Sequence, residues 1–196
     1  FHPALQSGSD SVLKRMRRRY TCTQFLDTIA AMRDRLDQPA FTTDAIVGFP
    51  GETDEEFEET VSVCREVGFS KIHIFPFSPR AGTPAALSPD QVAPAIRKQR
   101  VHRLESVQRQ LASEFHASQV GHTLEVLVER TAADQPDQPD QPDQPDQPDQ
   151  PDQPDQVRGT DRRYLPVTLP GTESDVGRLV EVVAVSGDET GVQGAR

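Results

Sequence analysis

Two apolar runs in the first 120 residues are short and bounded by turn residues, which is typical of buried strands. They lie at residues 41–47 and 71–77, and residues 1–5 resemble the end of another strand. Apolar positions spaced by three and four predict helices over residues 11–18, from a cap at Thr23 to residue 36, from a cap at Thr53 to Gly68, and over residues 91–118. The basic residues from Arg97 to Arg103 of the last helix are open between an RNA contact and ordinary surface, and Glu105 with the helix register favours the surface. Strands and helices that alternate with short connections indicate parallel βα units, an α/β fold.

The apolar period changes to two after Gly121. Leu124, Val126 and Val128 alternate with more polar neighbours, and residues 164–169 and 177–185 are further predicted strands. This pattern is typical of a small all-β barrel. We therefore expect two domains, an α/β domain over residues 1–119 and a β-barrel over residues 120–196.

An Asp-Gln-Pro repeat covers residues 134–156 and interrupts the predicted barrel. Proline at every third position removes backbone donors, so the repeat is expected to be extended or disordered. An expanded hairpin loop and a docking arm are both open interpretations. The repeat also explains the acidity of the chain, whose formal net charge is −10. Without its eight aspartates, 23 acidic residues face 21 basic ones, so composition does not exclude a nucleic-acid partner.

The two cysteines, Cys22 and Cys64, lie 42 positions apart, which fits no zinc or iron–sulfur pattern. Cys64 is predicted to be a core residue. Cys22 lies near a helix start, a position that can lower a thiol pKa, but a bystander role is the favoured interpretation. The five histidines have no metal-ligand spacing, and His73 is expected to pack within a strand. No apolar run has the length of a membrane span and no signal peptide is evident, so we expect a cytoplasmic protein without a membrane partner.

Three polar turns follow successive predicted elements, at residues 6–10, 48–53 and 78–83. Ligands of parallel α/β folds bind at the C-terminal ends of the strands, where these turns are expected. Each turn alone is explained by chain reversal. Together they predict a binding site.

Four motifs resemble the radical S-adenosylmethionine methylthiotransferases. They are FHPALQSGSD at residues 1–10, MRRRYT at 16–21, DAIVGFPGET at 44–53 and FPFSPRAGTPA at 75–85, in the order found in that family. The resemblance implies part of a (β/α)6 TIM-like barrel, namely its second half, followed by a small TRAM-like RNA-binding barrel. It is strongest to the branch that modifies N6-threonylcarbamoyladenosine (t6A37) in tRNA. The isopentenyladenosine branch and the ribosomal protein S12 aspartate branch are the alternatives.

The resemblance implies a transferase that converts a C–H bond to a methylthio group by radical chemistry. S-adenosylmethionine and two [4Fe-4S] clusters are the cofactors, and tRNA, not DNA, is the partner. The Cys-x₃-Cys-x₂-Cys motif of the family is absent from this sequence, which begins with Phe1 inside a motif. We therefore expect an N-terminally truncated fragment that has no metal ligands and is inactive by itself. A non-catalytic RNA-binding protein is the alternative of another class.

The resemblance also implies the binding residues. Gln6 and Ser7 are expected to face the ribose or methionine part of S-adenosylmethionine. The adenine is expected to lie between the ends of two successive strands. The first strand end comprises Val47, Gly48, Phe49, Pro50 and Gly51, and the second comprises Phe77 and Ser78.

Two basic groups are candidate tRNA contacts. The first consists of Lys14, Arg15, Arg17, Arg18 and Arg19; five cations in six positions repel one another unless a polyanion is near. A solvated helix face is the other interpretation of this group. The second consists of Arg162, Arg163 and Tyr164, where the ring could stack on a base or lie half-buried in a strand.

Overall fold

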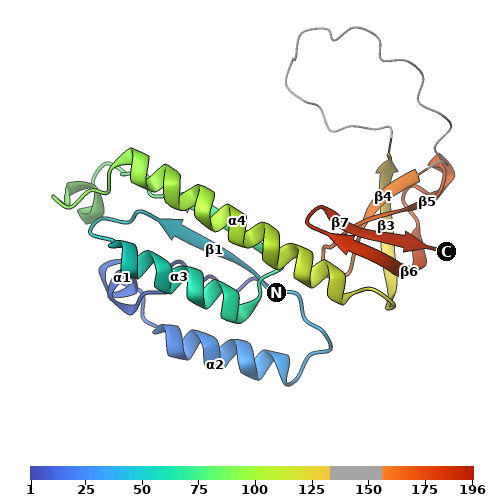
Figure 1. The fold of residues 1–196 in the computed structure, drawn as a ribbon, viewed down its shortest axis with the longest axis horizontal. Coiled ribbons are helices and arrows are strands. Elements are labelled where there is room, and N and C mark those ends of the chain that lie inside the picture. Colours follow the sequence, from blue (N-terminus) through green and yellow to red (C-terminus); the bar gives the residue numbers. More distant parts are fainter. Residues whose placement is uncertain (133–155) are drawn as a thin grey trace, which may run out of the picture. The chain divides into compact units, whose positions relative to one another are not determined.

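The protein is described here by a computed structural model that covers residues 1–132 and 156–196. The chain divides into two compact units, Phe1–Phe115 and His116–Arg196 (Figure 1). The Asp-Gln-Pro repeat, for which an extended or disordered segment was predicted, lies outside the described residues except for Gln156. No helix among the described residues is long and apolar enough to cross a membrane.

The first unit is an α/β layer structure built on two parallel strands. Strand β1 (Thr42–Val47) pairs with β2 (Lys71–Pro76) in a register that matches Thr42 with Lys71 and Val47 with Pro76. The helices are α1 (Asp10–Arg15), α2 (Cys22–Arg33), α3 (Asp54–Val67) and α4 (Pro94–Ser118), with a 3-10 turn, η1, at Pro84–Leu87. The order confirms the predicted α/β alternation.

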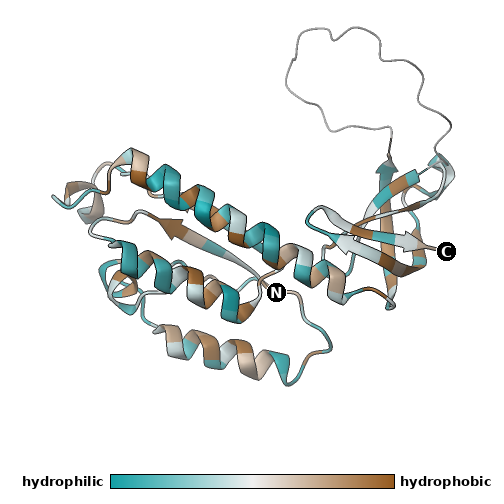
Figure 2. Ribbon diagram, in the orientation of Figure 1, coloured by the Kyte–Doolittle hydropathy of each residue, from teal (hydrophilic) through white to brown (hydrophobic). Residues whose placement is uncertain are grey.

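One hydrophobic core joins these elements. It takes Ala45 and Val47 from β1, Ile72 from β2, and apolar residues from α2, α3 and α4. Residues of β1 alternate between buried and half-buried positions, and Figure 2 shows α4 alternately hydrophilic and hydrophobic along its length. The predicted core position of Cys64 is confirmed, since its side chain is fully buried.

The helix ends were predicted with mixed success. The cap at Thr53 is confirmed, because its hydroxyl accepts from the Glu56 amide and the Glu56 carboxylate accepts from the Thr53 amide. Gly68 ends α3 in the left-handed conformation, as predicted. The predicted cap at Thr23 is wrong: Thr21 caps α2, in a capping box with Gln24.

Two predictions near the N-terminus are also wrong. Residues 1–5 form no strand; a single bridge joins Gln6 to Ala45 of β1 instead. The helix expected over residues 11–18 ends at Arg15, and Arg17 has a positive φ of 57°. The basic cluster is therefore divided between a short helix and the turn after it.

The second unit is a closed five-stranded barrel with the strand order β3-β4-β5-β7-β6. Its strands are β3 (Thr123–Thr131), β4 (Gln156–Asp161), β5 (Pro166–Pro170), β6 (Leu179–Asp188) and β7 (Gly191–Ala195), with a 3-10 turn, η2, at Glu173–Asp175. All neighbours pair antiparallel except β5 and β7.

The barrel core follows the predicted alternation. Leu124, Val126 and Val128 point inward with Val157, Val167, Leu169, Val182 and Val192. The strand predicted to start at Tyr164 begins only at Pro166, because residues 162–165 form a turn. Strands β4 and β7 were not predicted.

Candidate functional site

A cavity of about 430 Å³ lies at the C-terminal ends of β1 and β2. The two strands end side by side at Val47 and Pro76, and the Phe77 amide continues the ladder by donating to the Val47 carbonyl at 2.8 Å. The residues that line the cavity come from the segments around these strand ends: Gln6, Asp44, Ile46, Phe49, Phe75, Pro76, Phe77, Ser78, Arg80, Thr83 and Ala85. The cavity therefore has the place in the fold that the polar turns predicted.

Two aromatic rings form part of the apolar lining of the cavity. The ring centroids of Phe49 and Phe77 lie 5.2 Å apart at an interplanar angle of 73°, an edge-to-face pair. Polar groups of Gln6, Asp44 and Ser78 share the lining. Flat apolar surfaces with a few polar groups suit a planar heteroaromatic ligand that also carries hydroxyl groups.

Gln6 is held in place by backbone and side-chain bonds. Its amide donates to the Asp44 carbonyl at 2.8 Å, and its own carbonyl accepts from the Ile46 amide at 2.9 Å. The Arg18 guanidinium donates to its side-chain oxygen at 2.7 Å. This leaves the side-chain amide nitrogen as the donor that Gln6 can offer to a ligand.

The turn from Gly48 to Glu52 is tightened by its own carboxylate. The Gly48 amide donates to Glu52 Oε2 at 2.6 Å, and the Glu52 amide donates to the Phe49 carbonyl at 2.9 Å. Gly48 and Gly51 have φ values of 72° and 74°, which glycine adopts without strain. The turn thus holds the Phe49 ring at the cavity.

Arg100 of α4 fixes the same turn from outside the cavity. Its Nη1 donates to Glu52 Oε2 at 2.6 Å and to the Glu52 carbonyl at 3.2 Å, and its Nη2 donates to Asp54 at 2.7 Å. The Glu52 and Arg100 side chains are 1% and 6% exposed. Burial raises the Glu52 pKa, although the Gly48 amide and Arg100 oppose this effect.

Arg97, one turn before Arg100 on the same helix face, joins the two strand ends. Its stem lies against Gly48, where a Cβ would approach Arg97 Cγ to 2.3 Å. Its guanidinium donates to the Phe77 carbonyl. The favoured interpretation of ordinary surface residues is therefore wrong for Arg100, which is buried. For Arg97 it omits the contacts with Gly48 and with the Phe77 carbonyl. The spacing of three between the two arginines was the sequence signal that they share a face.

The structure brings four of the predicted cofactor residues to the cavity: Gln6, Phe49, Phe77 and Ser78. Five others, Ser7, Val47, Gly48, Pro50 and Gly51, are not among its lining residues. Ser7 is fully buried, with its hydroxyl 3.3 Å from that of Thr60, and Val47 belongs to the core. Sequence reasoning did not single out Asp44, Ile46, Phe75, Arg80 and Thr83, although all lie within or next to the predicted strands and turns.

The first basic cluster is partly engaged within the protein. Arg15 forms an ion pair with Glu56 at 2.6 Å and also donates to the Gly51 carbonyl at 3.2 Å. Its hydrogen bond lowers the Glu56 pKa to about 2. Arg18 binds Gln6, whereas Lys14, Arg17 and Arg19 are exposed. Arg15 and Arg18 thus bind groups of the protein itself, and the other three residues of the cluster remain candidate tRNA contacts.

The second basic cluster lies in the turn between β4 and β5. Buried Asp161 organises this turn by accepting from the Arg163 and Leu165 amides at 2.7 and 3.0 Å. The Arg163 guanidinium also pairs with Asp161 at 3.3 Å. Tyr164, with a φ of 62°, is 85% exposed, so the interpretation of a half-buried strand residue is wrong.

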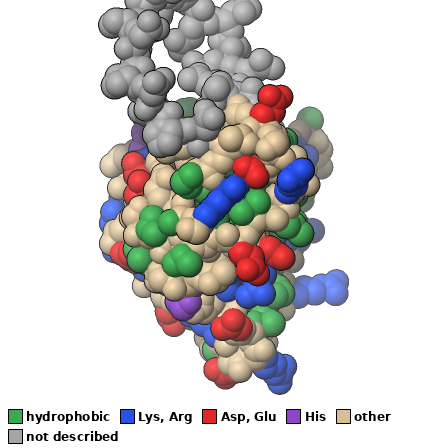
Figure 3. Space-filling view, turned by 90° about the vertical axis from the view of Figure 1, so that its right-hand side faces the viewer, with side chains coloured by type: hydrophobic (Ala, Val, Ile, Leu, Met, Phe, Trp, Pro, Cys, Tyr) green, Lys and Arg blue, Asp and Glu red, His purple; other side chains and the backbone are tan. Residues whose placement is uncertain are grey.

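Surface charge is otherwise mixed in one view of the molecule. In Figure 3, acidic, basic and apolar side chains are interspersed. The predicted packing role of His73 is limited to an exposed contact with the ring of His2, with centroids 5.8 Å apart.

The cysteines do not form a metal site with other residues. Among the described residues, no group of three or more His, Cys, Asp or Glu side chains could hold a metal ion. The helix start does not lower the Cys22 pKa, because burial, with the Asp10 side chain, raises it to about 12; this favours a bystander role for Cys22 over a reactive thiol. Burial raises the Cys64 pKa to about 12 as well.

Comparisons with a protein-family model and with known proteins agree on one family. The model of the radical SAM superfamily matches residues 1–64. The chain is 39% identical over 181 residues to the threonylcarbamoyladenosine tRNA methylthiotransferase of Bacillus subtilis, which covers 92% of this chain and 37% of the relative. It is 40% identical over 182 residues to the tRNA-2-methylthio-N(6)-dimethylallyladenosine synthase of Symbiobacterium thermophilum, 93% of this chain and 35% of the relative.

A third relative matches over a shorter range at higher identity. The tRNA-2-methylthio-N(6)-dimethylallyladenosine synthase of Kineococcus radiotolerans is 49% identical over 127 residues, 65% of this chain and 25% of the relative. The chain thus spans between a quarter and about two fifths of the length of these three relatives.

Proposed function

Because the chain belongs to the radical S-adenosylmethionine methylthiotransferase family, we propose that it is the part of a tRNA methylthiotransferase that holds the adenosyl group of S-adenosylmethionine and contacts tRNA. The proposed substrate is N6-threonylcarbamoyladenosine at position 37, which receives a methylthio group at C2. The relative from Bacillus subtilis and the motif at residues 16–21 support this choice. N6-dimethylallyladenosine is the second candidate, because relatives named for it match at similar identity.

The observation that carries the proposal is the cavity at the ends of β1 and β2. The edge-to-face rings of Phe49 and Phe77 offer apolar surface to an adenine, and the Gln6 amide and Ser78 hydroxyl offer hydrogen bonds to ribose hydroxyls. When bound here, S-adenosylmethionine would supply the radical chemistry of the family, and the methyl group would come from another S-adenosylmethionine. The residues of this chain bind and orient its adenosyl part.

An iron–sulfur cluster does not fit the residues described here. Two cysteines, one of them fully buried in the core and neither in a group of three or more possible ligands among the described residues, do not supply the four thiolates that hold a cluster. We therefore propose that the chain binds the adenosyl group but does not catalyse methylthiolation without further ligands. The two [4Fe-4S] clusters belong to the proposed whole enzyme.

The two units receive separate roles in this proposal. The α/β unit is proposed to be the second half of a (β/α)6 TIM-like barrel, and the five-stranded unit a TRAM-like RNA-binding barrel. The proposal keeps Lys14, Arg17 and Arg19 in the first unit and Arg162 and Tyr164 in the second as tRNA contacts.

Calorimetric titration of the 1–196 chain with S-adenosylhomocysteine tests the cavity, since this probe shares the adenosyl group and needs no iron. Phe77→Ala should weaken binding about tenfold, because one aromatic contact to a base is worth about 1–3 kcal/mol. Phe1→Ala, which changes an exposed ring outside the cavity, is the matched control and should bind as the unchanged chain does. Equal affinity of all three proteins would refute the adenosyl site.

The choice of substrate needs the whole enzyme. Mass spectrometry of tRNA nucleosides, in a strain that lacks it and after its return, should show the methylthio derivative of threonylcarbamoyladenosine. Appearance of the dimethylallyladenosine derivative instead would select the second candidate.

A further inference from the structure

A row of polar side chains crosses four strands on the outer face of the five-stranded barrel. The strand registers match Arg130 of β3 with Arg158 of β4, Arg158 with Thr168 of β5, and Thr168 with Gln193 of β7. Neighbouring strands lie about 4.8 Å apart, so the row extends over roughly 14 Å. Two guanidinium groups stand at one end of it.

Arg130 reaches this face because β3 contains a bulge. Leu124, Val126 and Val128 point into the barrel, so strict alternation would also turn residue 130 inward. The register shifts between Val128 and Arg130, which places Arg130 beside Arg158 on the outside. A bulge that re-aims one side chain is a common device next to functional sites.

The two arginines have no acidic partner in the described part of the chain. Like charges placed opposite each other on paired strands repel, and this repulsion is left uncompensated here. Glu129, the acidic residue nearest in sequence, accepts a hydrogen bond from Thr160 at 2.8 Å. An anion between the guanidinium groups would remove the repulsion.

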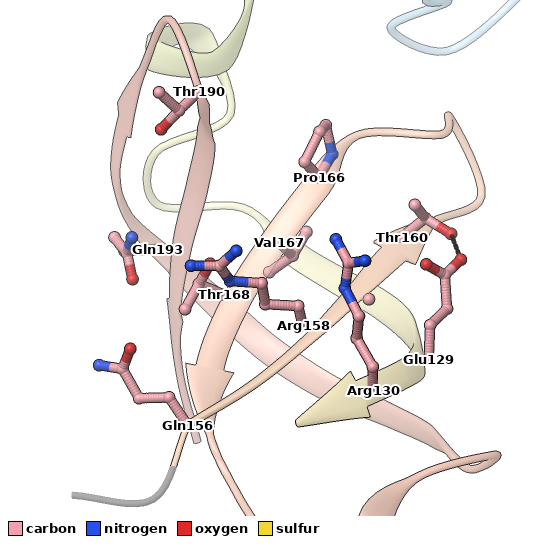
Figure 4. Close-up of a pocket in the computed structure, with 11 residues that line it drawn as sticks. Glu129, Arg130, Gln156, Arg158, Thr160, Pro166, Val167, Thr168, Thr190 and Gln193 are labelled. Carbon is pink, nitrogen blue, oxygen red and sulfur yellow. Dashed lines mark hydrogen bonds between the residues drawn. The ribbon is translucent and has the colours of Figure 1, made fainter. Parts of the chain in front are cut away.

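The pair lies in a groove of about 530 Å³ whose remaining lining is mainly neutral and polar. Figure 4 shows both guanidinium groups on the same side of β4, with the Gln156 and Gln193 amides on one side of them and Glu129 with Thr160 on the other. The groove therefore combines two fixed cations with amide and hydroxyl groups that can donate and accept hydrogen bonds.

We propose that this groove binds single-stranded RNA, with Arg130 and Arg158 on its phosphodiester backbone and Thr168 and Gln193 on ribose or base groups. The proposal rests on the proposed function, because it names the place at which that RNA partner meets the barrel. It differs from the candidates Arg162 and Tyr164, which lie in the turn after β4 and outside the groove lining.

The length of the row favours a polymer over a single small anion. Arginine forks bind phosphate oxygens bidentately, which the two guanidinium groups alone would satisfy. Thr168 and Gln193 continue the row over two more strands, where a single phosphate between the arginines would not reach them. Hydroxyl and amide side chains are suited to the 2′-hydroxyl and base edges of an exposed strand.

The test measures binding of a fluorescent single-stranded RNA oligonucleotide to the 1–196 chain at a series of salt concentrations. Arg130→Gln/Arg158→Gln should weaken binding at least tenfold at low salt. It should also reduce the slope of log K against log[salt] by about 0.7 to 1.4, which corresponds to one or two phosphate contacts. Arg130→Lys/Arg158→Lys should keep the slope and still lose affinity, because lysine keeps the charge without the fork.

A control variant with the same charge change is Arg178→Gln/Arg196→Gln, which alters residues of the barrel unit outside the groove lining. It should keep most of the affinity and of the slope. The thermal midpoint of the Arg130→Gln/Arg158→Gln variant should equal or exceed that of the unchanged chain, since a like-charge pair is removed.

The outcomes separate this inference from the proposed function. If the unchanged chain binds RNA and the two glutamine variants lose equal affinity and slope, the groove is the wrong place, although the RNA function stands. If the unchanged chain binds no RNA, the RNA part of the proposed function fails together with the groove. If the unchanged chain binds inorganic phosphate but no RNA, and Arg130→Gln/Arg158→Gln abolishes the phosphate binding, the groove is a site for a small anion and the proposal of an RNA ligand is refuted.

Discussion

Replacing Arg100 by methionine tests whether the buried ion pair with Glu52 holds the wall of the cavity. Methionine keeps the apolar stem but removes all three hydrogen bonds that Arg100 donates. The Glu52 carboxylate would remain buried with the Gly48 amide as its donor. The Asp54 carboxylate, which is 87% exposed, would be hydrated instead.

The magnitude follows from the unequal exposure of these groups. Removing one partner of a buried ion pair costs about 3–5 kcal/mol, because a charge is left without compensation. The exposed bond to Asp54 adds at most about 1 kcal/mol. We expect Arg100→Met to lower the free energy of unfolding of the first unit by about 3–5 kcal/mol. The double variant Glu52→Gln/Arg100→Met should lose clearly less, because no charge stays buried.

The assay is urea unfolding followed by far-UV circular dichroism, which reports on the first unit because it contains nearly all helical residues. The Glu52 pKa, already raised by burial, should rise further without Arg100. The folded state would then bind a proton that the unfolded chain releases near pH 4.3, so stability falls as pH increases above that value. The deficit of Arg100→Met should therefore be larger at pH 8 than at pH 4.5. A deficit below about 1 kcal/mol at pH 8 would refute the reasoning.

Three further changes have defined outcomes. Gly48→Ala should cost about 2–4 kcal/mol in the same unfolding assay, since alanine is strained at positive φ and its Cβ would meet the stem of Arg97. Arg15→Ala should lower stability by about 0.5–1 kcal/mol above pH 5 and by little near pH 2, because the Glu56 pKa is lowered to about 2 only while the pair exists; an equal deficit at both pH values would contradict this. Deletion of residues 134–155, which ends directly before β4, should leave the barrel folded by amide hydrogen exchange of its strands and tighten RNA binding at low salt, because eight aspartates are removed; unchanged affinity would show that their repulsion is negligible.

Local signals in the sequence predicted the parts of the fold that local chemistry decides. Thr53 with Glu56, and Gly68 after an apolar stripe, set the ends of α3 without help from distant residues. The wrong cap of α2 could have been avoided by the same rule. Thr21 has Gln24 three residues later and forms a capping box, whereas Thr23 is followed at that distance by Leu26.

Strands β4 and β7 were not predicted, because each is stabilised in part by pairing with a strand that is distant in the sequence. Strand β7 contains Gly191 and Gly194, and β4 begins with Gln156, the last residue of the repeat, so neither has a strong strand pattern of its own. Gly194 is required by packing, because a Cβ there would lie 2.7 Å from Val182 in β6. Such requirements come from the closed barrel, not from neighbours in the sequence.

The candidate site shows the same division. The turns at the strand ends were found because glycine and proline mark them; Phe49 lies within one of these turns and Phe77 directly before another. Arg97 and Arg100 were missed, because a basic residue on a long amphipathic helix is usually exposed and nothing local shows that it faces a buried carboxylate. Arg130 was hidden by a bulge, since strict alternation places it inside the barrel.

Binding and chemistry are therefore separable in this chain. The aromatic rings, Gln6 and Ser78 meet at the ends of two strands that α4 holds in place through Arg97 and Arg100. None of these groups is a metal ligand, and neither Cys22 nor Cys64 lines the cavity. Affinity for an adenosyl group should consequently be insensitive to iron. Titration with S-adenosylhomocysteine in the presence of a chelator should give the same dissociation constant as without it, whereas an iron-dependent constant would place the adenosyl site elsewhere.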